Sequence, residues 1–107
     1  MNIVFDHFLL YSINPEKTFE NIKAKFGFQE IYPIRNFGYF KSGMLLIGNT
    51  KLEILHYPKE IPAPNSNGSE LRFVGIALKT NIPPEETLKV LREKGIETSE
   101  ILNEDVL

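Results

Sequence analysis

Residues 3–27, which read IVFDHFLLYSINPEKTFENIKAKFG, decide the fold of this chain. The first nine are dense in β-branched and aromatic side chains, which predicts a largely buried strand. Asn14-Pro15-Glu16 then predicts a helix start, with a capping Asn, a Pro at the first helical position and an acid in the first turn. Phe19, Ile22 and Phe26 lie at i, i+3 and i+7 and form one apolar face, and Gly27 supplies a left-handed stop. We therefore expect the chain to open with a β–α unit.

Strand patterns recur after this unit. Three further strands are expected at residues 29–34, 39–47 and 51–57. The short Gly48-Asn49-Thr50 turn between the last two predicts an antiparallel hairpin. A stretch rich in Pro, Asn and Gly at 58–70 is typical of a linker loop. It is followed by a fifth strand at 71–80 and a second helix at 83–94, which Gly95 ends.

The second β–α unit repeats the first at a constant spacing. Leu10 corresponds to Leu78, Pro15 to Pro83 and Gly27 to Gly95. The first copy continues for three more strands, whereas the second stops after its helix. The sequence thus predicts a single α+β domain over 3–96, with a complete βαβββ module at 3–57, the linker at 58–70, a partial βα module at 71–96 and an acidic tail at 97–107.

Length, composition and charge limit the partners. A chain of 107 residues with 42% hydrophobic residues suits one small folded domain. Twelve basic and fourteen acidic residues give a net charge of −2, so neither nucleic acid nor an anionic membrane is an expected partner. The N-terminus has no signal-peptide pattern, no apolar run could span a bilayer, and there is no cysteine, so a cytoplasmic location is expected.

Several short motifs resemble the glyoxalase-like domains of the vicinal oxygen chelate superfamily (glyoxalase, bleomycin resistance and dioxygenase proteins). FDHFLL at 5–10 is similar to their first-strand "DH" signature, and FGF at 26–28 to the "LGF" that ends their helix. MLLIGNTKLEI at 44–54 resembles their "LEL" hairpin, and VGIALKT at 74–80 their "VGWALRT" strand. The resemblance implies a curved mixed sheet with helices on its convex side and a ligand cleft on its concave side.

The resemblance also implies a divalent metal (Zn, Ni, Mn or Fe) in some members. Their first ligand position matches His7 and their second matches Glu53, while the third falls on Gly75 and the fourth on a strand that is not in this sequence. A catalytic zinc usually takes three protein ligands, so His7 and Glu53 alone make an incomplete site. The same two residues are the candidate catalytic pair, because a carboxylate that orients an imidazole can work as an acid–base pair. A purely structural His–Glu pair is the alternative.

Strand alternation predicts which residues line the cleft. If the first and fourth strands are neighbours, side chains two residues apart share the face of His7 and Glu53. This mostly apolar wall is typical of a small-molecule site, and its candidate ligand-binding residues are Leu9, Tyr11, Leu55, Tyr57, Gly75, Ala77 and Lys79. Arg35 is a further candidate, for an anionic group of the ligand. The opposite faces, with Phe8, Leu10, Val74, Ile76 and Leu78, are expected to be buried against the two helices.

The leading functional hypothesis is a glyoxalase-like protein that binds a small organic molecule without a tightly held metal. A metal-dependent lyase, isomerase or dioxygenase, with its site completed by a second subunit, is the first alternative. A drug-sequestering protein of the bleomycin-resistance kind is the second. Because a partial module leaves the fifth strand with an unpaired edge and an open apolar face, a homodimer is also expected.

Overall fold

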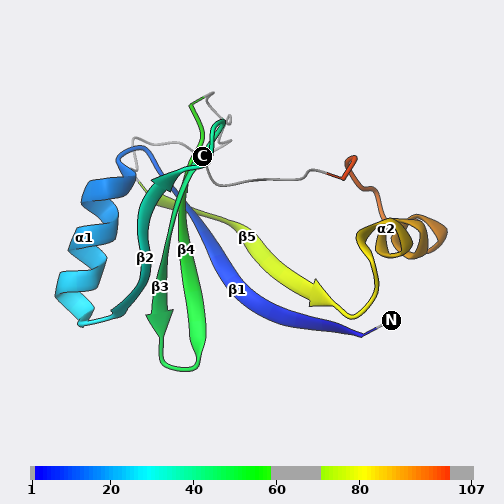
Figure 1. Cartoon of the computed structure of the whole chain (residues 1–107), viewed down its shortest axis with the longest axis horizontal. Coiled ribbons are helices and arrows are strands. Elements are labelled where there is room, and N and C mark those ends of the chain that lie inside the picture. The colour runs from blue at the N-terminus through cyan, green and yellow to red at the C-terminus, as the bar shows by residue number, and fades with distance from the viewer. Residues whose placement is uncertain (1, 59–70, 102–107) are drawn as a thin grey trace.

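The computed structural model describes residues 2–58 and 71–101 as an α+β fold (Figure 1). Its elements are β1 (Ile3–Ser12), α1 (Pro15–Phe26), β2 (Gln29–Asn36), β3 (Lys41–Ile47), β4 (Thr50–His56), β5 (Leu71–Thr80) and α2 (Pro84–Glu93). The order is the predicted βαβββ followed by βα, which confirms the fold class. Most of the predicted linker, at 59–70, and residues 102–107 of the predicted tail lie outside the described residues.

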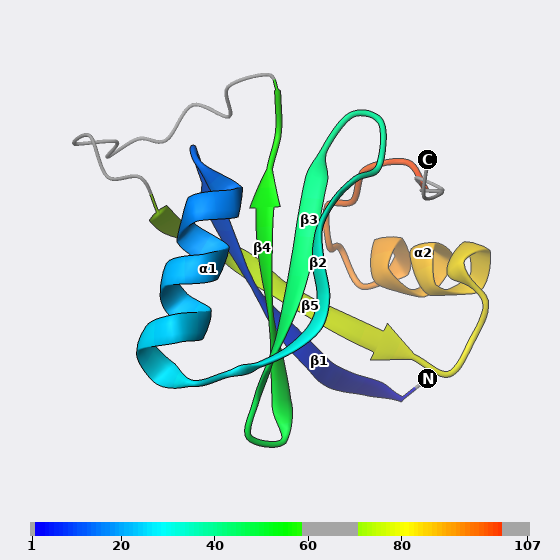
Figure 2. The ribbon, with the colours of Figure 1, turned by 60° about the vertical axis from the view of Figure 1, so that its left-hand side comes forward.

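The five strands form one mixed, curved sheet in the order β2-β3-β4-β1-β5 (Figures 1 and 2). The two central strands, β4 and β1, run parallel, and every other pair is antiparallel. The antiparallel β3–β4 hairpin is the predicted one, with Gly48 at φ 58° in its turn. A parallel pair needs a long crossover connection, and α1 with the β2–β3 hairpin supplies it.

A hydroxyl pair ties the end of β1 to the first turn of α1. Ser12 is fully buried, and its Oγ lies 2.7 Å from Thr18 Oγ1 and accepts the N–H of Asn14 at 3.1 Å. The prediction that Asn14 caps the helix with its side chain was wrong, because Asn14 contributes only its carbonyl, which accepts the N–H of Thr18 at 3.0 Å. The predicted left-handed stop at Gly27 is confirmed, with φ 66°.

The core lies between α1 and the strands β3 and β4. Its buried members are Phe19, Leu45, Leu52 and Ile54, with Leu10, Ile22, Phe28, Ile34 and Ile47 packed against them. Gly43 allows α1 to approach β3 closely, since a Cβ at this position would lie 2.9 Å from Cε2 of Phe19 and 2.7 Å from Cδ1 of Ile34. Burying such side chains contributes roughly 1.5–3 kcal/mol each, so this half of the sheet carries the stability of the fold.

The second helix forms as predicted but leaves the β1–β5 pair uncovered. It lies beyond the end of β5, on the side of the molecule away from α1 (Figures 1 and 2), and none of its residues is buried. Thr80 and Thr87 join the strand to the helix through their hydroxyls at 3.0 Å. The expected burial against the helices was wrong for four of the five residues, since their exposed fractions are Phe8 41%, Val74 38%, Ile76 48% and Leu78 51%. Leu10 does pack against the core.

Candidate functional site

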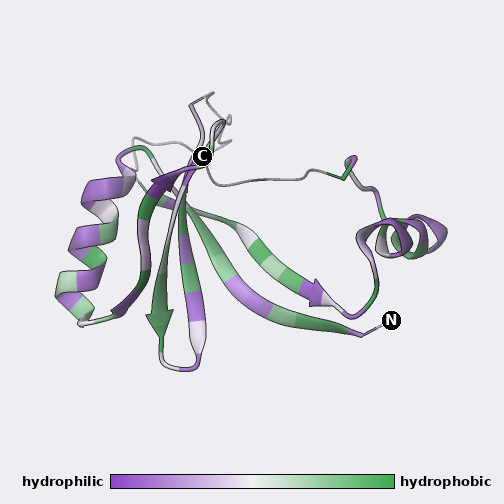
Figure 3. Ribbon diagram, in the orientation of Figure 1, coloured by the Kyte–Doolittle hydropathy of each residue, from purple (hydrophilic) through white to green (hydrophobic). Residues whose placement is uncertain are grey.

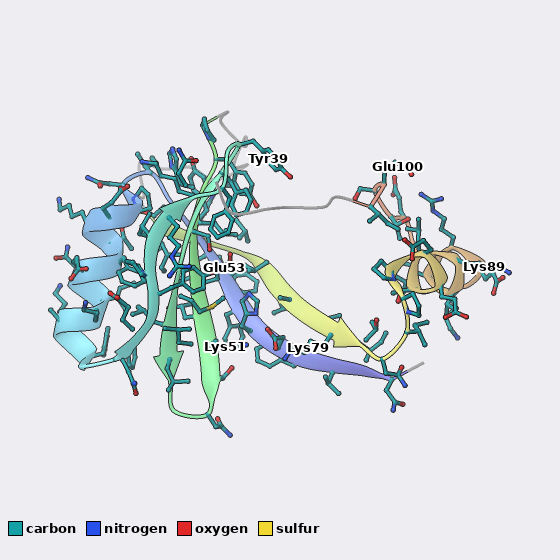
Figure 4. All side chains as sticks on the ribbon, in the orientation of Figure 1. Tyr39, Lys51, Glu53, Lys79, Lys89 and Glu100 are labelled. Atoms are coloured by element: carbon teal, nitrogen blue, oxygen red, sulfur yellow. The ribbon has the colours of Figure 1, made fainter. Side chains whose placement is uncertain are left out.

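Parallel pairing of β1 with β4 brings the predicted pair together. The register places Leu9 opposite Glu53 and His7 opposite Lys51, so all four side chains share the sheet face away from α1. His7 Nε2 lies 2.7 Å from Glu53 Oε1. We call this surface the His7 face; Figure 4 labels Glu53, which projects from β4 on it.

A β-bulge in β1 adds Asp6 to the pair. The register with β5 shifts between Phe5 and His7, so Asp6 is an extra residue opposite Ala77 and Leu78. A bulge re-aims a side chain, which explains how two consecutive residues of a strand turn to the same face. Asp6 Oδ2 lies 2.6 Å from His7 Nδ1.

His7 therefore sits between two carboxylates, one at each ring nitrogen. Each ring nitrogen is within hydrogen-bond distance of a carboxylate oxygen, Nδ1 of Asp6 Oδ2 and Nε2 of Glu53 Oε1. The side chains of His7, Asp6 and Glu53 are 11%, 13% and 15% exposed, so the three groups touch solvent only along one edge. The arrangement fixes the imidazole and leaves neither nitrogen facing open space.

Two lysines on the neighbouring strands form ion pairs with Asp6. Lys79 Nζ on β5 lies 2.9 Å from Oδ1 and Lys51 Nζ on β4 lies 3.3 Å from Oδ2 (Figure 4). The hydrogen bonds from Lys79, and then from His7, hold the pKa of Asp6 far below its usual range. The two lysines thus place two ammonium groups beside Asp6 on this part of the face.

Polar contacts continue beyond Glu53 into β3 and β2. The Ser42 hydroxyl donates to Glu53 Oε2, and Tyr32 Oη lies 3.1 Å from Ser42 Oγ. Burial raises the pKa of Tyr32 above its usual value. A continuous chain of polar groups thus runs from Lys79 through Asp6, His7 and Glu53 to Tyr32.

The remaining predicted residues take positions along the His7 face. Gly75 is opposite Leu9 and Ala77 opposite His7, as the alternation predicted. A Cβ built on Gly75 would meet nothing within 4 Å, so the place of the absent third ligand is open space. Leu55 is buried, and Lys79 contacts Asp6. Arg35 lies apart from these residues, with its guanidinium 5.0 Å from the ring centroid of Tyr32.

Aromatic rings gather at one end of the same face. Tyr11 stacks on Tyr57 with ring centroids 6.3 Å apart, and Phe40 lies 6.1 Å from Tyr57. The Arg72 guanidinium lies 5.0 Å from the Tyr11 ring centroid, within cation–π range. Tyr11 and Tyr57 were predicted on this face. Arg72 was not, because a second register shift in the β1–β5 pairing, between Leu9 and Leu10, turns its side chain to this face.

A metal ion does not fit the donors in the described part of the chain. Within residues 2–58 and 71–101, no three His, Cys, Asp or Glu side chains are grouped so that they could hold an ion. Asp6 and Glu53 lie against opposite nitrogens of His7, so the three cannot converge on one point. His56 Nδ1 donates to Ser12 O at 2.9 Å, and because His56 is three residues from Glu53 on β4 it projects to the opposite face and is no substitute ligand. His7 and Glu53 remain two donors where a catalytic zinc uses three.

Two open hollows lie beside α2. One of about 370 Å³ lies between Leu78 and Thr80 of β5, Leu88 and Leu91 of α2 and residues 98–101. Another of about 470 Å³ lies on the exposed side of α2, lined by Glu85, Leu88, Lys89, Arg92 and Glu93. Neither of these two hollows includes His7, and the cleft expected there stays a prediction.

The sequence reasoning missed four members of the polar chain: Asp6, Lys51, Ser42 and Tyr32. Strand parity carried a signal for Lys51, which is two residues from Glu53. For Asp6 the bulge hid the signal, because regular alternation assigns it to the face opposite His7.

No protein-family model, curated protein or solved structure matches the chain. In the part of the chain that the structure describes, neither helix is long and apolar enough to cross a membrane.

Proposed function

We propose that this chain is a glyoxalase-like protein that binds a small organic molecule on the His7 face, without a tightly held metal. One observation carries the proposal. A fixed cluster of His7, Asp6 and Glu53 lies beside the open space at Gly75, on a face that also carries apolar and aromatic side chains and two lysines. Small-molecule sites combine such apolar walls with a few placed polar groups.

The charges favour a ligand with an acidic group. Lys51 and Lys79 flank Asp6 on the same face, and the Lys79 side chain is 64% exposed, so part of its ammonium is accessible to a ligand anion. At the other end, Tyr57, which is only partly buried and stacks on Tyr11, offers an aromatic surface for a ring. An aromatic carboxylic acid is the class that uses both features.

Binding is better supported than catalysis. A general base needs a free nitrogen within reach of the proton that it abstracts. Both nitrogens of His7 face carboxylates at 2.6 and 2.7 Å, so His7 acts as a base only if a ligand displaces Glu53 or Asp6. In its present arrangement His7 is a rigid polar contact.

The test is a thermal-shift screen with small aromatic and aliphatic carboxylic acids. A ligand at 100 times its dissociation constant adds about 2.7 kcal/mol, which is roughly 10 °C for a domain of this size. We expect a hit whose shift is lost in His7→Gln and kept in His56→Gln, the matched control at the other histidine of the sequence. A screen without a hit, or a hit that both variants keep, would contradict the proposal.

The alternatives give different results in two further measurements. A metal-dependent lyase, isomerase or dioxygenase completed by a second subunit requires stoichiometric Zn, Ni, Mn or Fe in the purified protein. That metal would disappear in His7→Ala and in Glu53→Ala. A drug-sequestering protein would bind large planar drugs through Tyr11 and Tyr57 and would not depend on His7.

A further inference from the structure

The convex side of the β1–β5 pair carries a continuous apolar surface, which we call the open apolar face. Its members are Ile3, Phe5 and Phe8 of β1 and Phe73, Ile76 and Leu78 of β5, all between 41% and 62% exposed. The antiparallel register sets Phe5 opposite Leu78 and Phe8 opposite Ile76, so the residues are neighbours across the strands. Figure 3 shows the hydrophobic bands that run along both ribbons.

The same bulge that turns Asp6 inward builds this face. Because β1 gains one residue there, Phe5 and Phe8 fall on the same side although they are three residues apart, and their ring centroids are 4.8 Å apart. Asp6, Lys51 and Lys79 are all on the other side of the sheet. The open apolar face therefore has no charged residue among its members.

Its area is close to what a stable dimer needs. At roughly 200 Å² for a fully exposed large side chain, six such residues at about half exposure present about 600 Å². This is at the upper end for the largest patch on a monomer, about 300–600 Å², and three quarters of the roughly 800 Å² per partner in a standard interface. The hollow beside Leu78, lined by Leu88 and Leu91 of α2, extends the apolar surface.

We infer that the open apolar face is the interface with a second copy of this chain, with the two sheets packed face to face about a two-fold axis. An uncharged apolar face complements its own copy, as a two-fold interface requires. It offers no cation to nucleic acid or to an acidic peptide. The inference is independent of the proposed function, because the His7 face lies on the other side of the sheet.

Sedimentation equilibrium of the intact chain between about 1 and 200 μM tests the inference. We expect twice the chain mass at the upper concentrations and a melting temperature that rises with protein concentration. A monomer over the whole range would overturn the inference.

A matched pair of charged substitutions tests where the interface lies. Ile76 and Ile31 are both strand isoleucines, 48% and 46% exposed, but only Ile76 is on the open apolar face. Ile76→Asp should yield a monomer whose circular dichroism is that of the parent, and Ile31→Asp should stay dimeric. Equal effects of the two would overturn the inference.

A single introduced cysteine gives a readout that does not depend on a charged substitution. The sequence has no cysteine, so a disulfide in a one-cysteine variant must join two copies. Mild oxidation should cross-link Ile76→Cys at least tenfold faster than Ile31→Cys. Equal rates would show that copies meet only by random collision and would contradict the proposed interface.

Discussion

The two β–α units of this chain begin alike and end differently. In each, a hydroxyl at the end of the strand is bonded to a threonine of the helix: Ser12 to Thr18 and Thr80 to Thr87. However, α1 packs on β3 and β4 and buries Phe19 to 1% exposure, whereas no residue of α2 is buried. In this architecture a helix is therefore buried mainly by the strands that follow it in the chain, as α1 is by β3 and β4.

The largest difference in stability is expected between two truncated phenylalanines, one in the core under α1 and one on the open apolar face. Phe19→Ala should lower the free energy of unfolding by about 3–5 kcal/mol, because it opens a cavity in the core. Phe73→Ala, at a residue 62% exposed, should cost less than about 1 kcal/mol. Urea denaturation at micromolar concentration, where association is weak, measures both. Similar losses in the two variants would contradict the comparison.

The second prediction concerns the close approach of α1 to β3. Gly43→Ala should destabilise by about 1–3 kcal/mol, because the new methyl group overlaps Ile34 and Phe19. Shortening one neighbour should relieve part of this cost, so Ile34→Val/Gly43→Ala should lose less than the sum of the two single variants. Additive losses in urea denaturation would show that the close approach at Gly43 is not the cause.

The two hydroxyl pairs give a smaller difference. Ser12→Ala should cost about 1–3 kcal/mol, because the buried Thr18 hydroxyl loses a partner that water cannot replace and the Asn14 N–H loses its acceptor. Thr80→Val should cost under about 1 kcal/mol, since that pair is only part-buried and water can take its place. Thermal melts of both variants check the ranking, and a costlier Thr80→Val would reverse the comparison.

The smallest predicted effect is a dependence of the unfolding free energy on pH, caused by the contacts of Asp6. The pKa of Asp6 is lowered by Lys79, His7 and Lys51, so its carboxylate stabilises the fold above its ordinary pKa of about 3.9. That stability is lost as the pH falls towards the lowered pKa. The difference in unfolding free energy between the parent and Asp6→Asn should therefore be larger at pH 5 than at pH 3. Because Lys79 is largely exposed, solvent screens part of the effect. A difference that does not change with pH would mean that Asp6 is not ionised in these contacts.

Much of the fold could be predicted because its signals are local. The strand pattern at Ile3 to Tyr11, the helix stop at Gly27 and the turn at Gly48 depend on neighbours in the chain, and all three are confirmed. The approach of His7 to Glu53 was also predicted, but through a family resemblance that implied neighbouring strands.

Local sequence was sufficient to predict the order of the elements, because backbone geometry and side-chain periodicity are set within a few residues. Two features follow from tertiary contacts instead: Asp6 joins His7, and α2 leaves the β1–β5 face open. The first depends on a one-residue bulge between paired strands, and the second on which strands are present to receive a helix. Both are relations between distant segments, and local periodicity does not encode them.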